Sequence, residues 1–218
     1  MNINGYDVVG RMPPFKSALR DLVRRGLKTE TRRVIKPQPV DSGNGWFEWG
    51  YKFGAPKSTS PRSAFWHQET AMAGIGTAPI DEYCPYGHPG DICVMREPLR
   101  CTTGGYAEYV DDDAKEFRVM NFVLWIWETK TLPSIFMPTW AGRTLVCYTD
   151  IRAERLCNIS RDDAYAEGIT PADVEVYEGD SREAFRMLWN RINGKTHPWS
   201  SNPWVWVIEW KLLKPISA

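Results

Sequence analysis

The sequence predicts an α+β fold, a mostly antiparallel β-barrel with short helices attached and a loop-rich insertion at about residues 41–88. Segments with strand character outnumber those with helical periodicity, and no helical segment connects two obviously parallel strands. The insertion is dense in glycine, serine, proline and aromatic residues and has no sustained period. The length of 218 residues suits one domain, 1–218, that carries this insertion.

The first element is a helix after Pro13 and Pro14, and a strand follows it. Apolar residues recur at the spacing of one helical stripe: Phe15, Ala18, Leu19, Leu22 and Val23. Gly26 stands where a helix-terminating glycine is expected. Residues 28–35 are rich in Thr, Val and Ile, which favours a strand, and Pro37 ends it.

The middle of the chain predicts an irregular segment followed by several strands. Within 41–88 we expect an irregular hairpin around Trp46–Phe53 and a long loop, which in a compact domain is usually functional or mobile. Order resumes at 89–97, where a Pro-Gly-Asp turn leads into alternating apolar residues. Further strands are expected at 106–110, 117–127 and 144–156.

Two short helices and a closing strand complete the predicted order. Each helix has a capping-box candidate before it and a glycine after it: Ser160 and Asp163 with Gly168, and Asp180 and Glu183 with Gly194. The second helix has one apolar face, formed by Ala184, Phe185, Leu188, Trp189 and Ile192. Residues 204–213 (WVWVIEWKLL) alternate only weakly, which suits a strand buried on both faces.

Charge and cysteine content restrict the class of protein. The formal net charge is zero, so the whole chain does not resemble a generic nucleic-acid binder. Between Arg11 and Lys36 there are nine lysines and arginines but only two acidic residues, Asp21 and Glu30. This excess of positive charge could attract a phosphate-bearing ligand, or the basic residues could simply form a solvated helix face. Five cysteines at irregular spacing, with no secretory signal and no apolar run of membrane-spanning length, predict a cytoplasmic protein with reduced thiols and no membrane partner.

Cysteine, histidine and tryptophan offer weaker signals. Cys84, His88 and Cys93, with Cys101 nearby, have the ligand types for zinc, but the spacing fits no C-x2-C pattern. Buried thiols are the better interpretation, so we predict no metal and no cofactor. The eleven tryptophans divide into core-like and loop positions, and loop residues such as Trp140 could stack on bases, although ordinary packing is the commoner role.

The segment Gly26–Arg33, GLKTETRR, holds the residues with the most distinctive chemistry. It places a lysine, two threonines and two arginines directly after a helix stop. Strand side chains alternate between faces, so Lys28 and Thr31 can converge only if Lys28 lies in the turn and Thr31 opens the strand. A threonine hydroxyl needs a base to become nucleophilic, and a lysine desolvated beside other cations can be neutral enough to serve.

The order of these motifs resembles the ASCH family of PUA-like domains. A helix and G-x-K-T-x-T-x-R precede a Gly-Asp turn, a short helix ending in Glu-Gly, and a closing W-V-I-E-W strand. In this sequence those pieces are Gly26–Arg33, Gly90–Val94, Ile159–Gly168 and Trp204–Trp210. Longer stretches resemble ASCH proteins of bacteriophages and prophages, often labelled morphogenesis proteins: KPQP (36–39), CPYGHPGD (84–91), VMREP (94–98), PSIFMPTWAGR (133–143) and NPWVWVIEW (202–210).

The resemblance implies a PUA-like barrel, a bacterial host cytoplasm and a set of catalytic residues. The bacterial acetylcytidine amidohydrolases of this family place their catalytic lysine, threonine and glutamate at positions that match Lys28, Thr31 and Glu167. An amidohydrolase acting on an acylated nucleoside is therefore expected, in which Glu167 orients Lys28 or passes a proton to the leaving amine.

Other functions stay open at this point. Lys28 and Arg32 could instead hold a phosphate or carboxylate, in a module that binds RNA, a nucleotide or a modified nucleoside without catalysis. Lys28 and Glu167 could also form an ion pair that only closes the barrel. Glu30 could pair with Lys28, keep it protonated and weaken its role as a base. A ribonuclease ranks third and a morphogenesis factor last. The predicted ligand-binding residues are Thr29, Glu30, Arg32 and Arg33.

Overall fold

The computed structural model shows a mixed α+β chain whose sheets are mostly antiparallel. It describes residues 1–3, 5–43, 46–51, 62–67, 72–73, 78–79, 84–110, 119–177 and 179–213. Contacts between residues divide the chain into two compact units. The first consists of Met1–Gly26, Asp91–Cys147 and Lys211–Ala218, and the second of Leu27–Gly90 and Tyr148–Trp210. Among the described residues, no helix is both long enough and apolar enough to cross a membrane.

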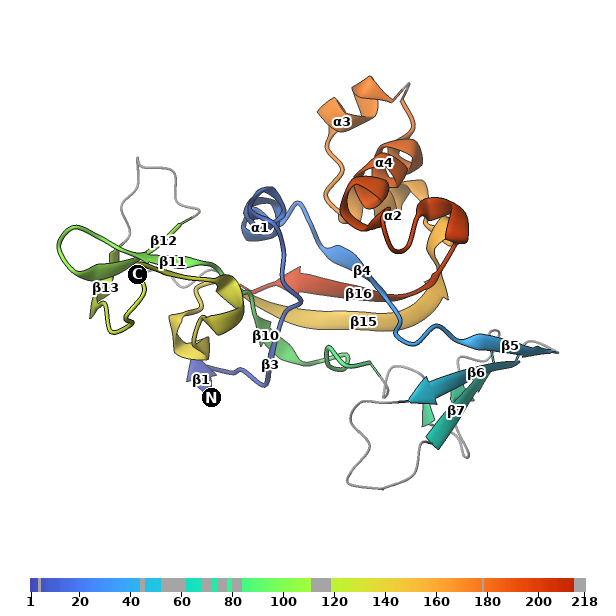
Figure 1. Cartoon of the computed structure of the whole chain (residues 1–218), viewed down its shortest axis with the longest axis horizontal. Helices are drawn as coiled ribbons and strands as arrows, with labels where there is room; N and C mark the ends of the chain where they lie inside the picture. The colour runs from blue at the N-terminus through green and yellow to red at the C-terminus, as the bar shows by residue number, and fades with distance from the viewer. Residues whose placement is uncertain are drawn as a thin grey trace. The chain divides into compact units, whose positions relative to one another are not determined.

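The described part of the first unit contains short strands and one α-helix. Its strands are β1 (Asn2–Ile3), β2 (Tyr6–Asp7), β3 (Gly10–Arg11), β10 (Ile92–Val94), β11 (Leu99–Cys101), β12 (Tyr106–Tyr109), β13 (Val119–Leu124), β14 (Thr131–Leu132) and the beginning of β15 (Leu145–Arg155). β10 pairs antiparallel with β15 and parallel with β3, while β13, β12, β11 and β14 form a separate antiparallel sheet (Figure 1). The strands predicted in this part of the sequence are confirmed where the structure describes them.

Helix α1 (Ser17–Arg24) confirms the first predicted element, with a narrower buried face than its apolar spacing suggests. Phe15 and Val23 are buried, whereas Ala18 is exposed. Gly26 has φ +69°, a left-handed conformation that glycine adopts without strain, and it ends the helix as predicted. The apolar core of this unit lies around Val94, Leu99 and Leu145.

The second unit is built on β4 (Glu30–Val34), β16 (Trp204–Leu212) and the remainder of β15. β16 lies next to β15 and pairs antiparallel with β4, with Val207 opposite Arg32 and Val205 opposite Val34. Residues 204–208 are all buried, which confirms the strand predicted to be covered on both faces. Because β4 is the last strand of this sheet, one of its edges is not paired with another strand of it.

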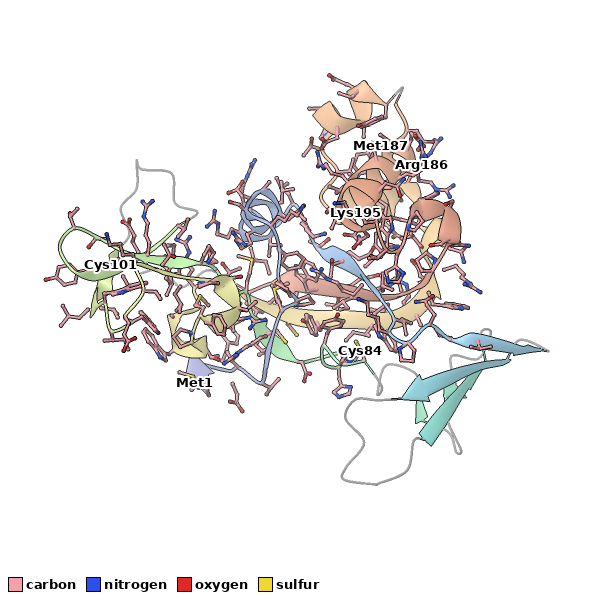
Figure 2. The ribbon with its side chains drawn as sticks, in the orientation of Figure 1. Met1, Cys84, Cys101, Arg186, Met187 and Lys195 are labelled. Carbon is pink, nitrogen blue, oxygen red and sulfur yellow. The ribbon has the colours of Figure 1, made fainter. Side chains whose placement is uncertain are left out.

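Three helices gather in this unit: α2 (Arg161–Ala166), α3 (Pro171–Val176) and α4 (Ser181–Asn193) (Figure 1). Val205 and Val207 of β16 belong to one apolar cluster with α2 and α4 residues, including Ala164 and Trp189. Short 3-10 turns, η4 (Leu156–Asn158) and η5 (Trp199–Ser201), complete the segment. Figure 2 draws Cys84 on the other side of β15 and β16 from these helices.

The capping residues place the helix ends largely as predicted. Ser160 and Asp163 form the expected capping box at the start of α2. Asp180 caps α4 by accepting from the Arg182 backbone, but the Glu183 side chain pairs with Arg186 instead of completing a box. On α4, Ala184, Phe185 and Trp189 are buried, whereas the predicted core residue Ile192 is exposed. Helix α3 was not predicted, although Thr170, Pro171 and Asp173 give its start a capping box and a proline at its first turn.

The described part of 41–88 contains strands where a hairpin and a long loop were expected. One antiparallel sheet joins five strands in chain order: β5 (Val40–Gly43), β6 (Trp46–Tyr51), β7 (Arg62–His67), β8 (Met72–Ala73) and β9 (Ala78–Pro79). β6 and β7 pair over their whole length, from Trp46 opposite His67 to Tyr51 opposite Arg62. The hairpin around Trp46–Phe53 therefore extends into a meander; Phe53 lies outside the described residues.

Candidate functional site

Lys28 and Glu167 meet where the turn before β4 contacts the end of α2. Glu167 is the C-terminal capping residue of α2, and the backbone N–H of Thr29 donates to the carbonyl of Ala166 at 2.8 Å. Gly168, at φ +96°, then turns the chain away. Lys28 lies in the turn before β4, as predicted for a lysine that could approach Thr31.

The Lys28 ammonium is buried and surrounded by oxygen. Its residue is 1% exposed, and Nζ donates to the Glu167 carboxylate Oε2 at 2.6 Å. Nζ also donates to the backbone carbonyls of Glu30 and Glu167, both at 2.7 Å. Burial lowers the pKa of Lys28 because it penalises the charged form, and the charge of Glu167 opposes that effect. Burial thus destabilises the charged form of Lys28, and the three hydrogen bonds of its ammonium stabilise that form.

Strand alternation separates the neighbours of Lys28 into two sets. Glu30 and Arg32 lie on the face of β4 that the helices cover, since Arg32 is opposite Val207 of the helix-packed cluster. Thr31 and Arg33 lie on the opposite face. Burial lowers the pKa of Arg33 there, and the charge of Glu167 is among the effects that oppose this change. Thr31 is buried one residue from the Glu30 carbonyl that Lys28 binds.

Arg32 is enclosed by carboxylates. Its Nη2 lies 2.6 Å from Glu154 Oε1 and 3.1 Å from Asp163 Oδ2. Its Nη1 bonds to the Glu30 carboxylate and lies 3.5 Å from Glu167 Oε1. The Arg32 side chain is fully buried, and all of these donors already have acidic partners inside the protein.

Arg152 of β15 extends the same cluster towards β16. It pairs with carboxylates of β4, β15 and β16, namely Glu30, Asp150, Glu154 and Glu209. We call the set of Lys28, Glu30, Arg32, Arg152, Glu154, Asp163 and Glu167 the β4 charge cluster. Acidic residues outnumber basic ones in it by one, so the cluster has no excess of positive charge to attract a further anion.

Glu30 has the most perturbed carboxyl of this cluster. The residue is 1% exposed, and burial raises its pKa to about 8. Arg32 opposes that rise, while the charges of Glu167 and Asp163 add to it. The expected pairing with Lys28 takes a different form, because Lys28 binds the Glu30 backbone carbonyl while the carboxylate binds Arg32 and Arg152. Glu30 therefore holds a proton over much of the neutral range.

The structure brings together most of the residues predicted from the sequence. Lys28 and Glu167 are in direct contact, and Thr29 joins their turn to α2. Arg32 and Glu30 contact each other beside them. The catalytic and ligand-binding roles given to these residues stay predictions. The contacts of Arg32 favour an internal role over binding of an external anion.

Sequence reasoning missed Arg152, Glu154 and Asp163 as members of the charge cluster. Arg152 and Glu154 are two residues apart on one strand, a spacing that places them on the same face and could have marked them. Asp163 was recognised only as a capping residue. It is also a member of the charge cluster, because its Oδ2 accepts hydrogen bonds from both the Ser160 N–H and Arg32.

The cysteines form no metal centre among the described residues. In the described part of the chain, no group of three or more Cys, His, Asp or Glu side chains could hold a metal ion. Cys84 and Cys93 are buried, which agrees with their interpretation as thiols of the core.

Comparison with known proteins identifies no relative: no family model, curated protein or solved structure matches this chain.

Proposed function

We propose that the chain is a PUA-like domain of the ASCH type that hydrolyses the amide bond of an acylated nucleoside. One observation supports this proposal above others: a lysine that is 1% exposed lies 2.6 Å from a buried glutamate. Burial has already lowered the pKa of that lysine, which brings it closer to the neutral form a general base needs. Thr31 follows the Glu30 carbonyl that Lys28 binds, and it supplies the hydroxyl in this proposal. Because strand alternation turns Thr31 to the other face from Glu30 and Arg32, the proposal requires Lys28 to reach that face from the turn before β4.

The proposed reaction begins with a proton shift inside the Lys28–Glu167 pair. Lys28 passes a proton to Glu167 over the 2.6 Å hydrogen bond, which leaves a neutral amine and a carboxylic acid. The amine takes the Thr31 proton as the hydroxyl oxygen attacks the acyl carbonyl. When the C–N bond breaks, Glu167 gives its proton to the leaving nitrogen. Water then cleaves the Thr31 ester, its proton replacing the one that Thr31 lost.

The charge of the cluster supports an uncharged nucleoside as the substrate. The cations Arg32 and Arg152 already pair with carboxylates, so the cluster offers a phosphate no excess of positive charge. A neutral nucleoside needs no such excess.

A second function, nucleoside binding without hydrolysis, is favoured by the three oxygens around Lys28 Nζ. Three acceptors suit an ammonium with three protons, and such an ammonium cannot act as a base. In this case Lys28 and Glu167 would hold the end of α2 against β4, and the ligand would bind beside them.

A hydrolysis assay separates these two functions. The full chain is incubated with N4-acetylcytidine, and cytidine and acetate are quantified by chromatography. We expect Lys28→Met, Thr31→Ala and Glu167→Gln each to lower the rate at least about a hundredfold, the contribution of a general base or nucleophile. Exposed residues supply matched controls, Lys195→Met and Thr149→Val, which should keep the rate.

The binding function predicts a different result from the same proteins. Wild type would release no cytidine, yet N4-acetylcytidine would raise its melting temperature, and Glu167→Gln would reduce that shift. An unchanged rate in folded Thr31→Ala would rule out the threonine nucleophile. Thermal melting of every variant checks that the fold is retained.

A further inference from the structure

Residues 133–143 of the first unit form a loop whose backbone is firmly held. Leu132, Met137 and Ala141 are buried in the core of that unit. Two 3-10 turns, η2 (Ser134–Phe136) and η3 (Thr139–Ala141), are closed by backbone hydrogen bonds of 2.9–3.2 Å. The Tyr109 hydroxyl also donates to the Ala141 carbonyl at 2.6 Å. This segment presents its remaining side chains from a fixed backbone.

The outward side chains of this loop are large and apolar. Ile135 is 50% exposed, Phe136 65% and Trp140 43%. They lie between the buried anchors Leu132, Met137 and Ala141, so core packing of the loop does not require them. Three exposed residues of this size within six positions, on an ordered backbone, are typical of a binding surface.

Two arginines flank these side chains. Arg96 Nη1 donates to the Ile135 carbonyl at 2.8 Å, and Arg11 Nε donates to Thr139 Oγ1 at 3.2 Å. The pKa of Arg96 is lowered by burial and by repulsion from the nearby charge of Arg11. Within the ranges that the structure describes, neither forms an ion pair with an acid, and Arg96 Nε is buried without a hydrogen-bond partner.

We propose that Arg11, Arg96, Ile135, Phe136 and Trp140, named here the Trp140 surface, bind single-stranded nucleic acid. Phe136 and Trp140 stack on bases, and Ile135 covers the sugar or base edge between them. Arg11 and Arg96 donate to the phosphates, which relieves their mutual repulsion. The surface lies wholly in the first unit and depends on no step of the proposed hydrolysis.

The two arginines favour nucleic acid over an apolar partner. A purely hydrophobic protein surface would bury Arg11 and Arg96 without anions, which costs free energy. A phosphodiester chain supplies an anion at every nucleotide and a flat apolar face between anions. That pattern complements aromatic side chains flanked by guanidinium groups.

The test measures binding of fluorescein-labelled single-stranded U12 RNA to the full chain by anisotropy at two salt concentrations. We expect Phe136→Ala with Trp140→Ala to raise the Kd at least about tenfold, since stacking on even one base contributes this much. Arg11→Ala with Arg96→Ala should raise the Kd at low salt and lessen its salt dependence, because fewer phosphates are contacted. Exposed residues of the second unit give the matched controls, Tyr165→Ala and Arg161→Ala, whose Kd should equal that of wild type.

Three results would overturn the proposal. The first is no binding of U12 by wild type. The second is binding that the Phe136/Trp140 and Arg11/Arg96 variants leave unchanged. The third is that these variants lose binding to vesicles containing anionic lipid while their RNA affinity is unchanged, which would identify a membrane surface instead. N4-Acetylcytidine hydrolysis by the same variants should stay at the wild-type rate, so failure here is distinguishable from failure of the proposed enzyme.

Discussion

Two buried glutamates, Glu97 in the first unit and Glu30 in the second, each form ion pairs with two arginines, but the charges around the two pairs differ. Glu97 Oε1 lies 2.8 Å from Arg24 Nη1 and 2.9 Å from Arg143 Nη2, and its Oε2 lies 3.0 Å from Arg143 Nε. The Arg143 guanidinium also stacks 3.9 Å over the Tyr109 ring. Arginine is in excess around Glu97, whereas carboxylate is in excess around Glu30.

The difference shows that two arginine partners do not by themselves keep a buried carboxyl ionised. At Glu30, burial together with the charges of Glu167 and Asp163 raises the pKa to about 8 despite Arg32 and Arg152. The Glu97 cluster, with a bidentate arginine on an aromatic ring, has the geometry of a structural ion pair. In the β4 charge cluster, burial instead brings the pKa of Glu30 into the neutral range.

Removing Glu97 should have the largest effect on stability. Glu97→Ala leaves Arg24 and Arg143 partly buried without their shared carboxylate, and an arginine cannot lose its proton to escape the penalty. We expect a loss of about 4 kcal/mol in the free energy of unfolding, measured by urea denaturation. Arg25→Ala, which breaks an exposed pair with Asp21, is the control and should cost under about 1 kcal/mol. Equal losses in the two variants would contradict a structural role for Glu97.

Removing Lys28 should cost less, because its partner keeps a second cation nearby. In Lys28→Met, Arg32 Nη1 still lies 3.5 Å from Glu167 Oε1. We expect a loss of about 2–3 kcal/mol, below the value for a buried charge that is left without any partner. Adding Glu167→Gln should cost much less than it does alone, since the two residues interact directly. Strict additivity in the double-mutant cycle would show that the 2.6 Å contact carries no coupling.

Glu30→Gln should change the pH dependence of stability more than stability itself. The pKa of Glu30 rises from 4.5 to about 8 on folding, so between these values the folded state holds a proton that the unfolded state has lost. Stability therefore falls as pH rises across this window, by at most about 1.4 kcal/mol per pH unit. The window of Asp163, whose pKa is lowered, lies below 3.8, and the lowered pKa of Lys28 gives a slope of opposite sign below 10.5.

The measurement compares wild type with Glu30→Gln by urea denaturation from pH 5 to 8. The difference between the two proteins isolates the Glu30 contribution, because Lys28 and Asp163 are present in both. The exposed Glu175→Gln should follow the wild-type curve. Parallel curves for wild type and Glu30→Gln would show that Glu30 is ionised in the folded protein.

Local patterns predicted the elements whose signals are contained in one segment. The buried run of β16, the capping box of Ser160 and the end of α1 at Gly26 all depend on neighbouring residues. Helix α3 has the same kind of start and the same length as α2, so its capping signal was present in the sequence and was overlooked. Within 41–88 only the hairpin around Trp46–Phe53 was expected, because the pairing of the other strands depends on tertiary contacts rather than on a local period.

The candidate site was predictable in part for the same reason. Lys28 and Glu167 were named from family resemblance, and the structure places them in contact across 139 positions of sequence. Arg32 was expected to face a ligand, yet strand alternation turns it towards Glu154 and Asp163. Those partners come from a distant strand and helix, so only the tertiary fold could reveal that its donors are occupied.

Asp163→Asn should have the smallest effect on stability and the most specific effect on the charge cluster. Asparagine keeps an oxygen for the Ser160 N–H but removes one of the charges beside Arg32, whose Nη2 lies 3.1 Å from Asp163. We expect a loss of about 1 kcal/mol at pH 7. Because the Asp163 charge helps to raise the pKa of Glu30, the variant should lower that pKa and move the pH-dependent loss of stability to lower pH. Urea denaturation over the same pH series, with Asp162→Asn on the same helix as control, checks this shift. A variant curve that shifts no more than the control would show that burial and Glu167, without Asp163, account for the raised pKa of Glu30. In that case the number of carboxylates would not be what distinguishes this cluster from the one around Glu97.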